Sequence, residues 1–97
     1  MLWNWLRRWW SRPDRTSWQL VLYTRHGCHL CETARQQLER ARRRHGFTLQ
    51  AIDVDTDAEL AARFGAEVPV VAVNGKVRFR GGVNPVLLER LFAGGHE

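Results

Sequence analysis

The sequence contains little cysteine, proline and lysine, and it has no long apolar run. Its 97 residues include two cysteines and three prolines, and Lys76 is the only lysine among 15 basic residues. No apolar run approaches the roughly 18 residues that a membrane-spanning helix requires, and we find no internal repeat or low-complexity tract. These absences exclude a transmembrane helix, a repeat solenoid and a scaffold held together by many disulfides.

The composition is that of one small globular domain. Hydrophobic residues make up 44% of the chain and charged residues 26%, which is typical of a globular protein rather than a disordered or fibrous one. A chain of this length is too short for two cores but long enough for one. Arginine supplies nearly all of the positive charge, and the net charge of +5 favours anionic partners.

The hydrophobic pattern predicts strands and helices that alternate along the chain. Continuous apolar runs at 20–23 and 70–73 indicate strands covered on both faces. The predicted order is β-α-β-α-β-β-α, with strands at 20–23, 47–54, 70–73 and 76–80 and helices at 30–44, 57–64 and 85–92. This is an α/β fold in which a parallel βαβ start is followed by an antiparallel hairpin, giving a four-stranded mixed sheet flanked by helices.

Short motifs predict where these elements begin and turn. Thr56 and Glu59 have the spacing of a capping box at the start of a short helix. Asn74-Gly75 is a preferred two-residue hairpin turn, and Asn84, which precedes a proline, is a suitable cap for the last helix. Helical spacing predicts that the apolar face of the first helix consists of Leu30, Cys31, Ala34, Leu38 and Ala41.

The two cysteines lie in the motif Cys28-His29-Leu30-Cys31, where the first strand passes into the first helix. At a helix N-terminus, unpaired backbone N–H groups face the Cys28 sulfur and favour its thiolate form. Arg25 and His26 add positive charge nearby. Cys31 lies one turn further along on the apolar face, where it is less exposed and suited to displace a group bound to Cys28. A pair this close cannot connect distant parts of a fold, so the motif predicts thiol–disulfide chemistry.

From Gln19 to Phe92 the chain resembles the glutaredoxin-like branch of the thioredoxin superfamily. The resemblance rests on the strand, the Cys-x-x-Cys motif and the helix, together with Glu67-Val68-Pro69 before the third strand and Gly81-Gly82 before the last helix. The Cys-His-Leu-Cys motif is similar to that of short bacterial glutaredoxin-like proteins. The resemblance implies a thioredoxin fold and a thiol–disulfide oxidoreductase in which Cys28 is the nucleophile and Cys31 the resolving cysteine.

The resemblance also implies roles for residues around the cysteines. It implies that Pro69 is a cis proline opposite Cys28 and that the Val68 backbone hydrogen-bonds an extended substrate. It further implies that Arg25 meets a carboxylate of glutathione, while Asn84 and the amides after Gly82 hold another. The expected site consists of the catalytic residues Cys28 and Cys31 and the substrate-binding residues Arg25, His26, His29, Val68, Pro69, Gly82 and Asn84.

The expected substrates are disulfides of proteins or small molecules. Glutathione or a thioredoxin-type protein would supply the electrons, and no cofactor is required. Two alternatives use the same cysteines. One is a metal or iron–sulfur cluster carrier, in which zinc would take His26 and His29 as further ligands, although the adjacency of Cys28 and His29 strains a tetrahedral site. The other is a membrane-recruited adaptor whose redox state regulates binding.

Residues 1–18 are expected to form an extension ahead of a domain at 19–97. They contain all five tryptophans. On a helix one face would have Arg7 and Arg8 and the opposite face would be apolar, which suits a membrane interface; the apolar face would consist of Leu2, Trp3, Trp5, Leu6, Trp9 and Trp10. Residues 1–12 would then contact a membrane peripherally, or the extension would pack on the domain or on a second copy as a dimer. The two arginines also interrupt the apolar stretch of a secretory signal. We therefore expect a cytoplasmic location, peripheral to the inner membrane if the extension binds lipid.

A run of three arginines, Arg42 to Arg44, resembles a nucleic-acid-binding patch. Cations are also favoured at the C-terminus of a helix because they complement its dipole. No aromatic stacking platform accompanies the arginines. The sequence therefore favours a local role at the helix end over a nucleic-acid partner.

Overall fold

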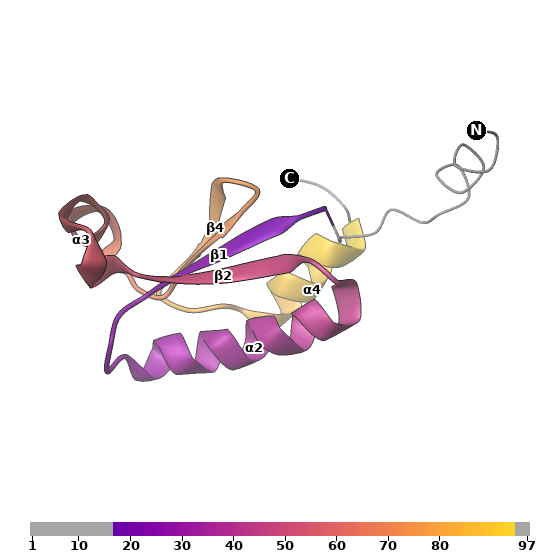
Figure 1. The fold of residues 1–97 in the computed structure, drawn as a ribbon. Coiled ribbons are helices and arrows are strands. Elements are labelled where there is room, and N and C mark those ends of the chain that lie inside the picture. Colours follow the sequence, from indigo (N-terminus) through magenta and orange to yellow (C-terminus); the bar gives the residue numbers. More distant parts are fainter. Residues whose placement is uncertain (1–16, 95–97) are drawn as a thin grey trace, which may run out of the picture.

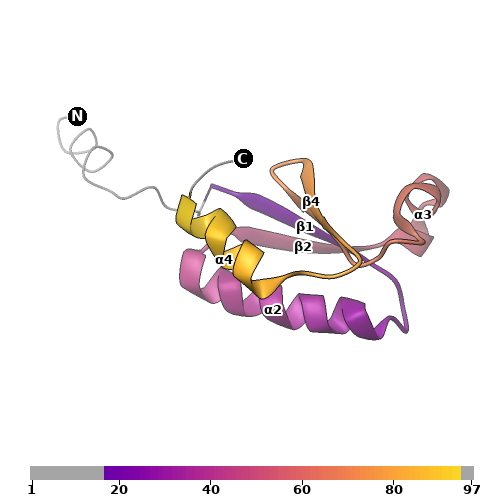
Figure 2. The same cartoon turned by 180° about the vertical axis from the view of Figure 1, so that it is seen from behind.

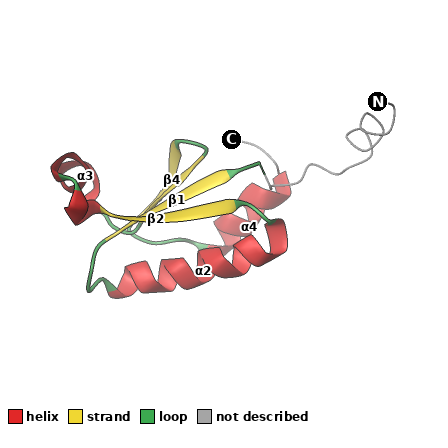
Figure 3. Cartoon of the chain, viewed as in Figure 1, coloured by secondary structure: helices red, strands yellow, loops and turns green. Residues whose placement is uncertain are grey.

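The computed structural model describes residues 17–94, which fold into a mixed four-stranded sheet with helices on both faces (Figure 1). The sheet order is β2-β1-β3-β4, with β2 parallel to β1 and the other two pairs antiparallel. The elements are β1 (Gln19–Thr24), α2 (His29–His45), β2 (Thr48–Asp53), the 3-10 turn η1 (Val54–Thr56), α3 (Ala58–Phe64), β3 (Val70–Val73), β4 (Lys76–Arg80) and α4 (Pro85–Gly94). Figure 3 shows their types along the chain. The predicted order and the mixed sheet are confirmed.

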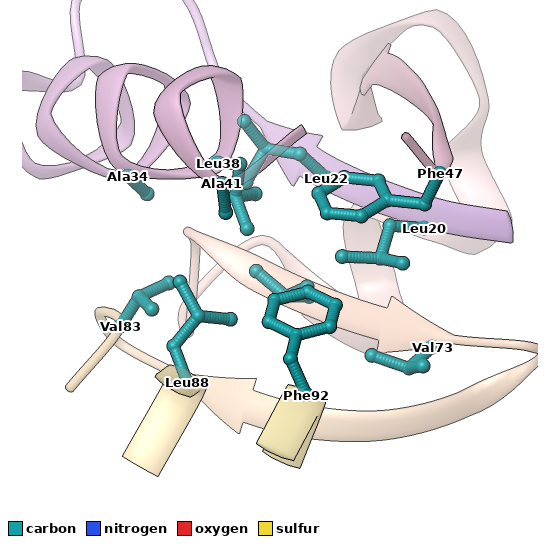
Figure 4. Close-up of a cluster of buried hydrophobic side chains, with 11 residues drawn as sticks. Leu20, Leu22, Ala34, Leu38, Ala41, Phe47, Val73, Val83, Leu88 and Phe92 are labelled. Atoms are coloured by element: carbon teal, nitrogen blue, oxygen red, sulfur yellow. The ribbon is translucent and has the colours of Figure 1, made fainter. Parts of the chain in front are cut away.

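Helices α2 and α4 cover one face of the sheet (Figures 1 and 2). Successive side chains of a strand point to opposite faces, so alternate residues of β1 and β3 meet these helices. In Figure 4, Leu88 and Phe92 of α4 point toward the side chains of α2 and the sheet, and the Phe92 ring stacks on Phe47 with the centroids 5.2 Å apart. The buried cluster consists of Leu20, Leu22, Ala34, Leu38, Ala41, Phe47, Val71, Val73, Val83, Leu88 and Phe92.

The short helix α3 packs against the other face of the sheet. Phe64 forms a second buried cluster with Val54 and Val70, and its ring stacks on Tyr23 at 4.5 Å between centroids. Strands β1 and β3 therefore contribute side chains to both clusters. This two-sided burial explains why the sequence of each strand is a continuous apolar run.

The turn and the last helix begin as the sequence predicted. Asn74 and Gly75 both have positive φ angles, 52° and 85°, which the two-residue hairpin turn requires. The Asn74 side chain also accepts a hydrogen bond from the Gln19 amide at 2.8 Å, which connects the turn to β1. Asn84 caps α4, since its side-chain oxygen accepts hydrogen bonds from the amides of Val86 (2.9 Å) and Leu87 (3.1 Å).

The predicted capping box of α3 is wrong by one residue. Asp57, not Thr56, is the N-cap, and its carboxylate accepts hydrogen bonds from the amides of Glu59 (2.8 Å) and Leu60 (3.4 Å). The Thr56 hydroxyl instead donates to the carbonyl of Asp53 at 2.7 Å. The η1 turn continues through Thr56, so the first residue free to adopt cap geometry is the next one, and aspartate caps as well as threonine.

The predicted apolar face of α2 is correct except for Leu30. Cys31, Ala34, Leu38 and Ala41 are buried, but Leu30 is 55% exposed. Leu30 belongs to the first turn of α2, and neither buried cluster of the described chain includes it. Cys31, in the same turn, is 2% exposed, so helical spacing identifies the buried face of a helix but not how far that face extends around the helix.

Trp18, at the end of the predicted extension, packs on the domain. Its ring lies 5.6 Å from that of Phe92 between centroids, and its carbonyl accepts a hydrogen bond from the Thr48 amide at 3.0 Å. Residues 1–16, on which the expected membrane and dimer contacts fall, lie outside the described residues. Within residues 17–94, none of the helices is long and apolar enough to cross a membrane.

Candidate active site

Cys28 is the N-cap residue of α2. Its backbone is extended (φ −92°, ψ 112°), which turns its sulfur toward the first turn of the helix. Sγ of Cys28 accepts a hydrogen bond from the Cys31 amide at 3.1 Å. A helix begins with N–H groups that lack partners inside the helix, and here the sulfur takes the place that a serine or aspartate oxygen usually occupies. Cys28 is half-buried and is a free thiol.

Cys31 lies behind Cys28 and is almost completely buried, with 2% of its surface exposed. Burial raises the pKa of its thiol above the ordinary value of 9.0, and its hydrogen bond with Cys28 and the charge of Cys28 raise it further. Interactions with the Thr24 side chain and the Arg25 backbone lower the pKa but do not reverse the shift. Cys31 therefore keeps its proton at neutral pH and is shielded from reagents in solution.

Arg25 connects the loop between β1 and α2 (residues 25–28, the cysteine loop) to two other segments of the chain. Its guanidinium donates two hydrogen bonds to the Asp55 carboxylate, from Nε (3.0 Å) and Nη2 (2.9 Å), and a third from Nη1 to the Gly65 carbonyl (3.0 Å). The hydrogen bonds to Asp55 and the charge of Asp55 raise the pKa of Arg25, while the hydrogen bonds from Arg25 lower the pKa of Asp55. The Arg25 carbonyl in turn accepts from the Cys28 amide at 3.2 Å.

Gly65 leaves the space that the Arg25 side chain occupies. A Cβ atom at Gly65 would lie 2.7 Å from Nη2 of Arg25 and 2.5 Å from the Ala61 carbonyl oxygen. The backbone oxygen is fixed by the helix, so a side chain could be accommodated only if the end of α3 moved. The glycine at the end of α3 is therefore part of the structure that holds the cysteine loop.

An open pocket of about 570 Å³ lies beside the two cysteines. It is formed by the end of β1, the cysteine loop, the first two turns of α2 and the end of β2. Five of the predicted site residues line it, and the structure adds six residues that were not among the predicted site residues. The predicted residues are Arg25, His26, Cys28, His29 and Cys31, and the others are Thr24, Gly27, Glu32, Arg35, Ala51 and Asp53.

The remaining predicted site residues, Val68, Pro69, Gly82 and Asn84, do not line this pocket. The Val68–Pro69 peptide bond is cis, and the carbonyl of Pro69 accepts a hydrogen bond from the Gly81 amide at 2.9 Å. That bond holds the proline segment against the Gly81-Gly82 turn. The oxygen of the Asn84 side chain is engaged by the amides of α4.

The residues that sequence reasoning missed are joined to the cysteines only by the tertiary fold. Asp55 and Gly65 are 30 and 40 positions from Arg25, and no local motif pairs them. Arg35 had a usable signal, because it lies seven positions after Cys28 and helical neighbours recur at three and four positions. Among residues 17–94, no group of three or more His, Cys, Asp or Glu side chains is arranged to hold a metal ion.

Several solved structures have a similar fold, and they include a thioredoxin and two proteins solved by structural genomics. The chain is similar to protein Ne2328 of Nitrosomonas europaea, with a TM-score of 0.70, 24% identity and coverage of 84% of this chain and 99% of the other. It is also similar to protein XcR50 of X. campestris (TM-score 0.65, 28% identity, 80% and 99% covered). A thioredoxin from Halobacterium salinarum has a TM-score of 0.63 at 21% identity, with 84% and 77% covered. The fold is thus thioredoxin-like.

Sequence comparison agrees with the structural comparison. The uncharacterized protein Rv0508 of Mycobacterium tuberculosis is 38% identical over 71 residues, which is 68% of each chain. A protein of Mycobacterium bovis, Mb0520, matches to the same extent. Residues 19–92 match the family described as Glutaredoxin-like domain (DUF836), so this chain belongs to that glutaredoxin-like family of the thioredoxin superfamily.

Proposed function

We propose that this protein is a dithiol thiol–disulfide oxidoreductase in which Cys28 attacks and Cys31 resolves. One observation carries the proposal: the half-buried Cys28 sulfur caps α2, accepts the Cys31 amide at 3.1 Å and lies in an open pocket, with the buried Cys31 directly behind it. Hydrogen bonding from a helix N-terminus stabilises a thiolate. The thiolate is the nucleophile in disulfide exchange.

The reaction takes two displacement steps. The Cys28 thiolate attacks one sulfur of the substrate, so a Cys28–substrate disulfide forms, the substrate S–S bond breaks and one thiolate leaves. Cys31 then loses its proton to the departing group and attacks Sγ of Cys28, which forms the Cys28–Cys31 disulfide and releases the second thiol. The two cysteines are oxidised and the substrate disulfide is reduced to two thiols. A thiol reductant, such as glutathione or a thioredoxin-type protein, returns the two electrons.

The raised pKa of Cys31 fits the resolving role. A protonated, buried Cys31 does not compete with Cys28 for the incoming disulfide. Burial is the largest cause of the raised pKa, and the negative charge of Cys28 adds a smaller contribution. Formation of the mixed disulfide removes that charge and therefore favours ionisation of Cys31 in the second step.

The cytoplasm is the location that we propose for this activity, because a reducing compartment returns the pair to its dithiol form. No resident metal or organic cofactor takes part in the proposed steps. The cluster-carrier alternative receives no support from the arrangement of ligands in the described chain.

The roles of the two cysteines are tested with single substitutions. We expect Cys28→Ser to reduce the rate of disulfide reduction to the uncatalysed level. Cys31→Ser should instead accumulate a substrate adduct on Cys28, visible as an added mass that dithiothreitol removes. The proposal fails if both variants lose activity and neither forms an adduct, or if the adduct forms on Cys31 in Cys28→Ser.

A further inference from the structure

The charged side chains of the domain are distributed unevenly between its two ends. One end has the cysteine loop, the start of α2 and the short helix α3, and the other has the C-terminal ends of α2 and α4 and the first residues of β1 and β2 (Figures 1 and 2). Six of the eight carboxylates in residues 17–94 lie at the first end, which we call the cysteine end. They are Glu32, Asp53, Asp55, Asp57, Glu59 and Glu67.

The opposite end, which we call the basic end, is rich in positive charge. Strand register places Lys76 there, because it pairs with Val73, which in turn pairs with Leu20 near the start of β1. Glu89 of α4 forms an ion pair with Arg44 of α2, which brings the last turns of the two helices together. This end has five basic side chains and two carboxylates, namely Arg42, Arg43, Arg44, Lys76 and Arg90 with Glu39 and Glu89.

The carboxylates of the basic end leave part of its charge unmatched. They are paired with Arg42 and Arg44, whereas Arg43 and Arg90 are exposed and form no ion pair with any residue of 17–94. The helix dipole accounts for cations in the last turn of α2, but Lys76 comes from β4 and Arg90 from α4. Three elements therefore build a positive surface that complements an anionic partner.

The N-terminal extension joins the domain at this same end. The Trp18 carbonyl accepts a hydrogen bond from the Thr48 amide at 3.0 Å, and the Trp18 ring lies beside that of Phe92 in α4. Residues 1–16, which precede it, contain four tryptophans, four arginines and a single acidic residue. Tryptophan suits the boundary between water and lipid, and arginine is attracted to anionic headgroups. The extension thus has the same sign of charge as the surface to which it is joined.

We infer that the basic end is a docking surface for an anionic lipid bilayer and that the cysteine end faces away from it. The 17 residues of α2 separate Cys28 from the basic end by about 25 Å at 1.5 Å per residue. This is about three times the Debye length of roughly 8 Å at physiological ionic strength. The carboxylates of the cysteine end are repelled by the same headgroups, so the asymmetry orients the molecule. Disulfides then reach the pocket from the aqueous side.

Other partners fit this surface less well. A second copy that presented its own basic end would be repelled by the like charge. A nucleic acid offers phosphates and base edges, whereas the apolar face that the sequence predicts for the extension is typical of a segment that lies in a bilayer interface. A bilayer is the partner that uses both the arginines and the tryptophans.

The first experiment measures binding of the full-length protein to vesicles of phosphatidylglycerol and phosphatidylcholine in equal amounts, with vesicles of phosphatidylcholine alone as the neutral reference. All five tryptophans lie within residues 1–18, so tryptophan emission reports only on that part of the chain. We expect binding to the anionic vesicles alone, weakened by salt, and quenching of the emission by brominated acyl chains. Failure to bind the anionic vesicles, or binding without quenching, would overturn the inference.

The second experiment compares two double variants of equal net charge. Arg43→Gln/Arg90→Gln should weaken binding to the anionic vesicles about 25-fold, because each basic side chain near such a surface contributes about fivefold. Arg35→Gln/Arg63→Gln removes two arginines at the cysteine end and should leave the affinity unchanged. Equal losses for the two variants would overturn the inference, since total charge would then decide binding.

Orientation and partner class are tested on the same protein. Iodoacetamide should alkylate Cys28 at the same rate in vesicle-bound and free protein, and protection by the vesicles would contradict the orientation. Tighter binding to a DNA duplex than to the anionic vesicles would assign the basic end to nucleic acid and overturn the inference. None of these readouts requires turnover of a disulfide, so the docking surface and the proposed function can fail separately.

Discussion

At the scale of residues, Cys28 and Cys31 have the same side chain in different surroundings. One sulfur caps a helix at the edge of a pocket, and the other is buried beneath it. The hydrogen bond between them runs from the Cys31 amide to the Cys28 sulfur, so the backbone of one residue stabilises the side chain of the other. Their roles follow from these surroundings rather than from the amino-acid type.

Alkylation of Cys31 tests its burial. In Cys28→Ser the contributions of the Cys28 sulfur to the Cys31 pKa are gone, but burial, which is the largest cause, remains. A raised thiol pKa keeps the unreactive protonated form present to higher pH. We therefore expect iodoacetamide to modify Cys31 very slowly at pH 7 to 8, with the rate still rising above pH 9.0, the ordinary thiol pKa. Rapid modification at pH 7 would contradict the burial of this thiol, and the same protein unfolded in urea provides the reference rate.

The Arg25–Asp55 pair is expected to hold the cysteine loop. Asp55→Asn removes the charge that the guanidinium meets, so the loop should open more often and the Cys28 amide should exchange its hydrogen faster. Arg25→Lys should have the same effect, because an ammonium cannot form the two parallel bonds that a guanidinium forms. Glu59→Gln removes a carboxylate from the neighbouring helix α3 and should not change the exchange rate. If the Cys28 amide were equally protected in the unsubstituted protein and in all three variants, the Arg25–Asp55 pair would not hold the cysteine loop.

Acid should weaken the same pair. The pKa of Asp55 is lower in the folded protein than its ordinary value of 3.8, so the folded state favours the ionised form. The stabilisation from this group is therefore fully present above pH 3.8 and is lost as the pH falls through the lowered value. The difference in unfolding midpoint between Asp55→Asn and the unsubstituted protein should disappear in that acidic range. A difference that persists below it would contradict this assignment.

At the scale of elements, helix α4 depends on its cap. The Asn84 oxygen accepts hydrogen bonds from two amides that have no partner within the helix. Asn84→Ala should lower the free energy of unfolding by about 1 kcal/mol, whereas Asn84→Asp should retain the cap. Urea denaturation measures both, with unchanged m-values expected because the surface exposed on unfolding stays the same. Equal stabilities for the alanine and aspartate variants would show that the cap contributes little.

The elements themselves could be predicted well because their signals are local. The Asn74-Gly75 turn needs two positive φ angles, which few residue pairs tolerate, and the alternation of apolar runs with helical spacing set the order of the elements. Two details could not be predicted in this way. The N-cap of α3 is Asp57 and not Thr56, because Thr56 is still part of η1. Leu30 is exposed although Cys31, its neighbour in the same turn of α2, is buried. Both depend on what surrounds the element.

At the scale of the whole molecule, the aromatic cluster around Phe92 connects the last helix to the rest of the fold. The Phe92 ring contacts Phe47, Trp18 and His45, at 5.2, 5.6 and 4.3 Å between ring centroids. Phe92→Ala should cost about 3–5 kcal/mol, a large share of the 5–15 kcal/mol that stabilises a typical domain. Val86→Ala, on the exposed side of the same helix, should change stability by no more than about 0.5 kcal/mol. Similar losses for both would contradict the packing described.

The candidate site could be predicted only in part, because the tertiary fold, and not a local motif, brings some of its residues together. Cys28, Cys31 and their position at the start of a helix follow from four consecutive residues and the pattern on either side. Asp55 and Gly65 are brought to Arg25 by the order of the strands. The guanidinium of Arg25 makes three hydrogen bonds to these two residues, where the family resemblance implied a glutathione carboxylate. Arg35 lines the pocket only because β2 supplies the opposite part of its wall, through Ala51 and Asp53.

The measurement that tests the dithiol most directly is a redox titration of the full chain in mixtures of reduced and oxidised glutathione. After equilibration, free thiols are alkylated and the labels are counted by mass. If Cys28 and Cys31 act as a pair, two labels disappear together in one transition with the slope of a two-electron couple, about 30 mV per tenfold change in the equilibrium ratio. Two labels that persist across the whole range, or a glutathione adduct that remains on Cys28 while Cys31 stays free, would contradict the pair.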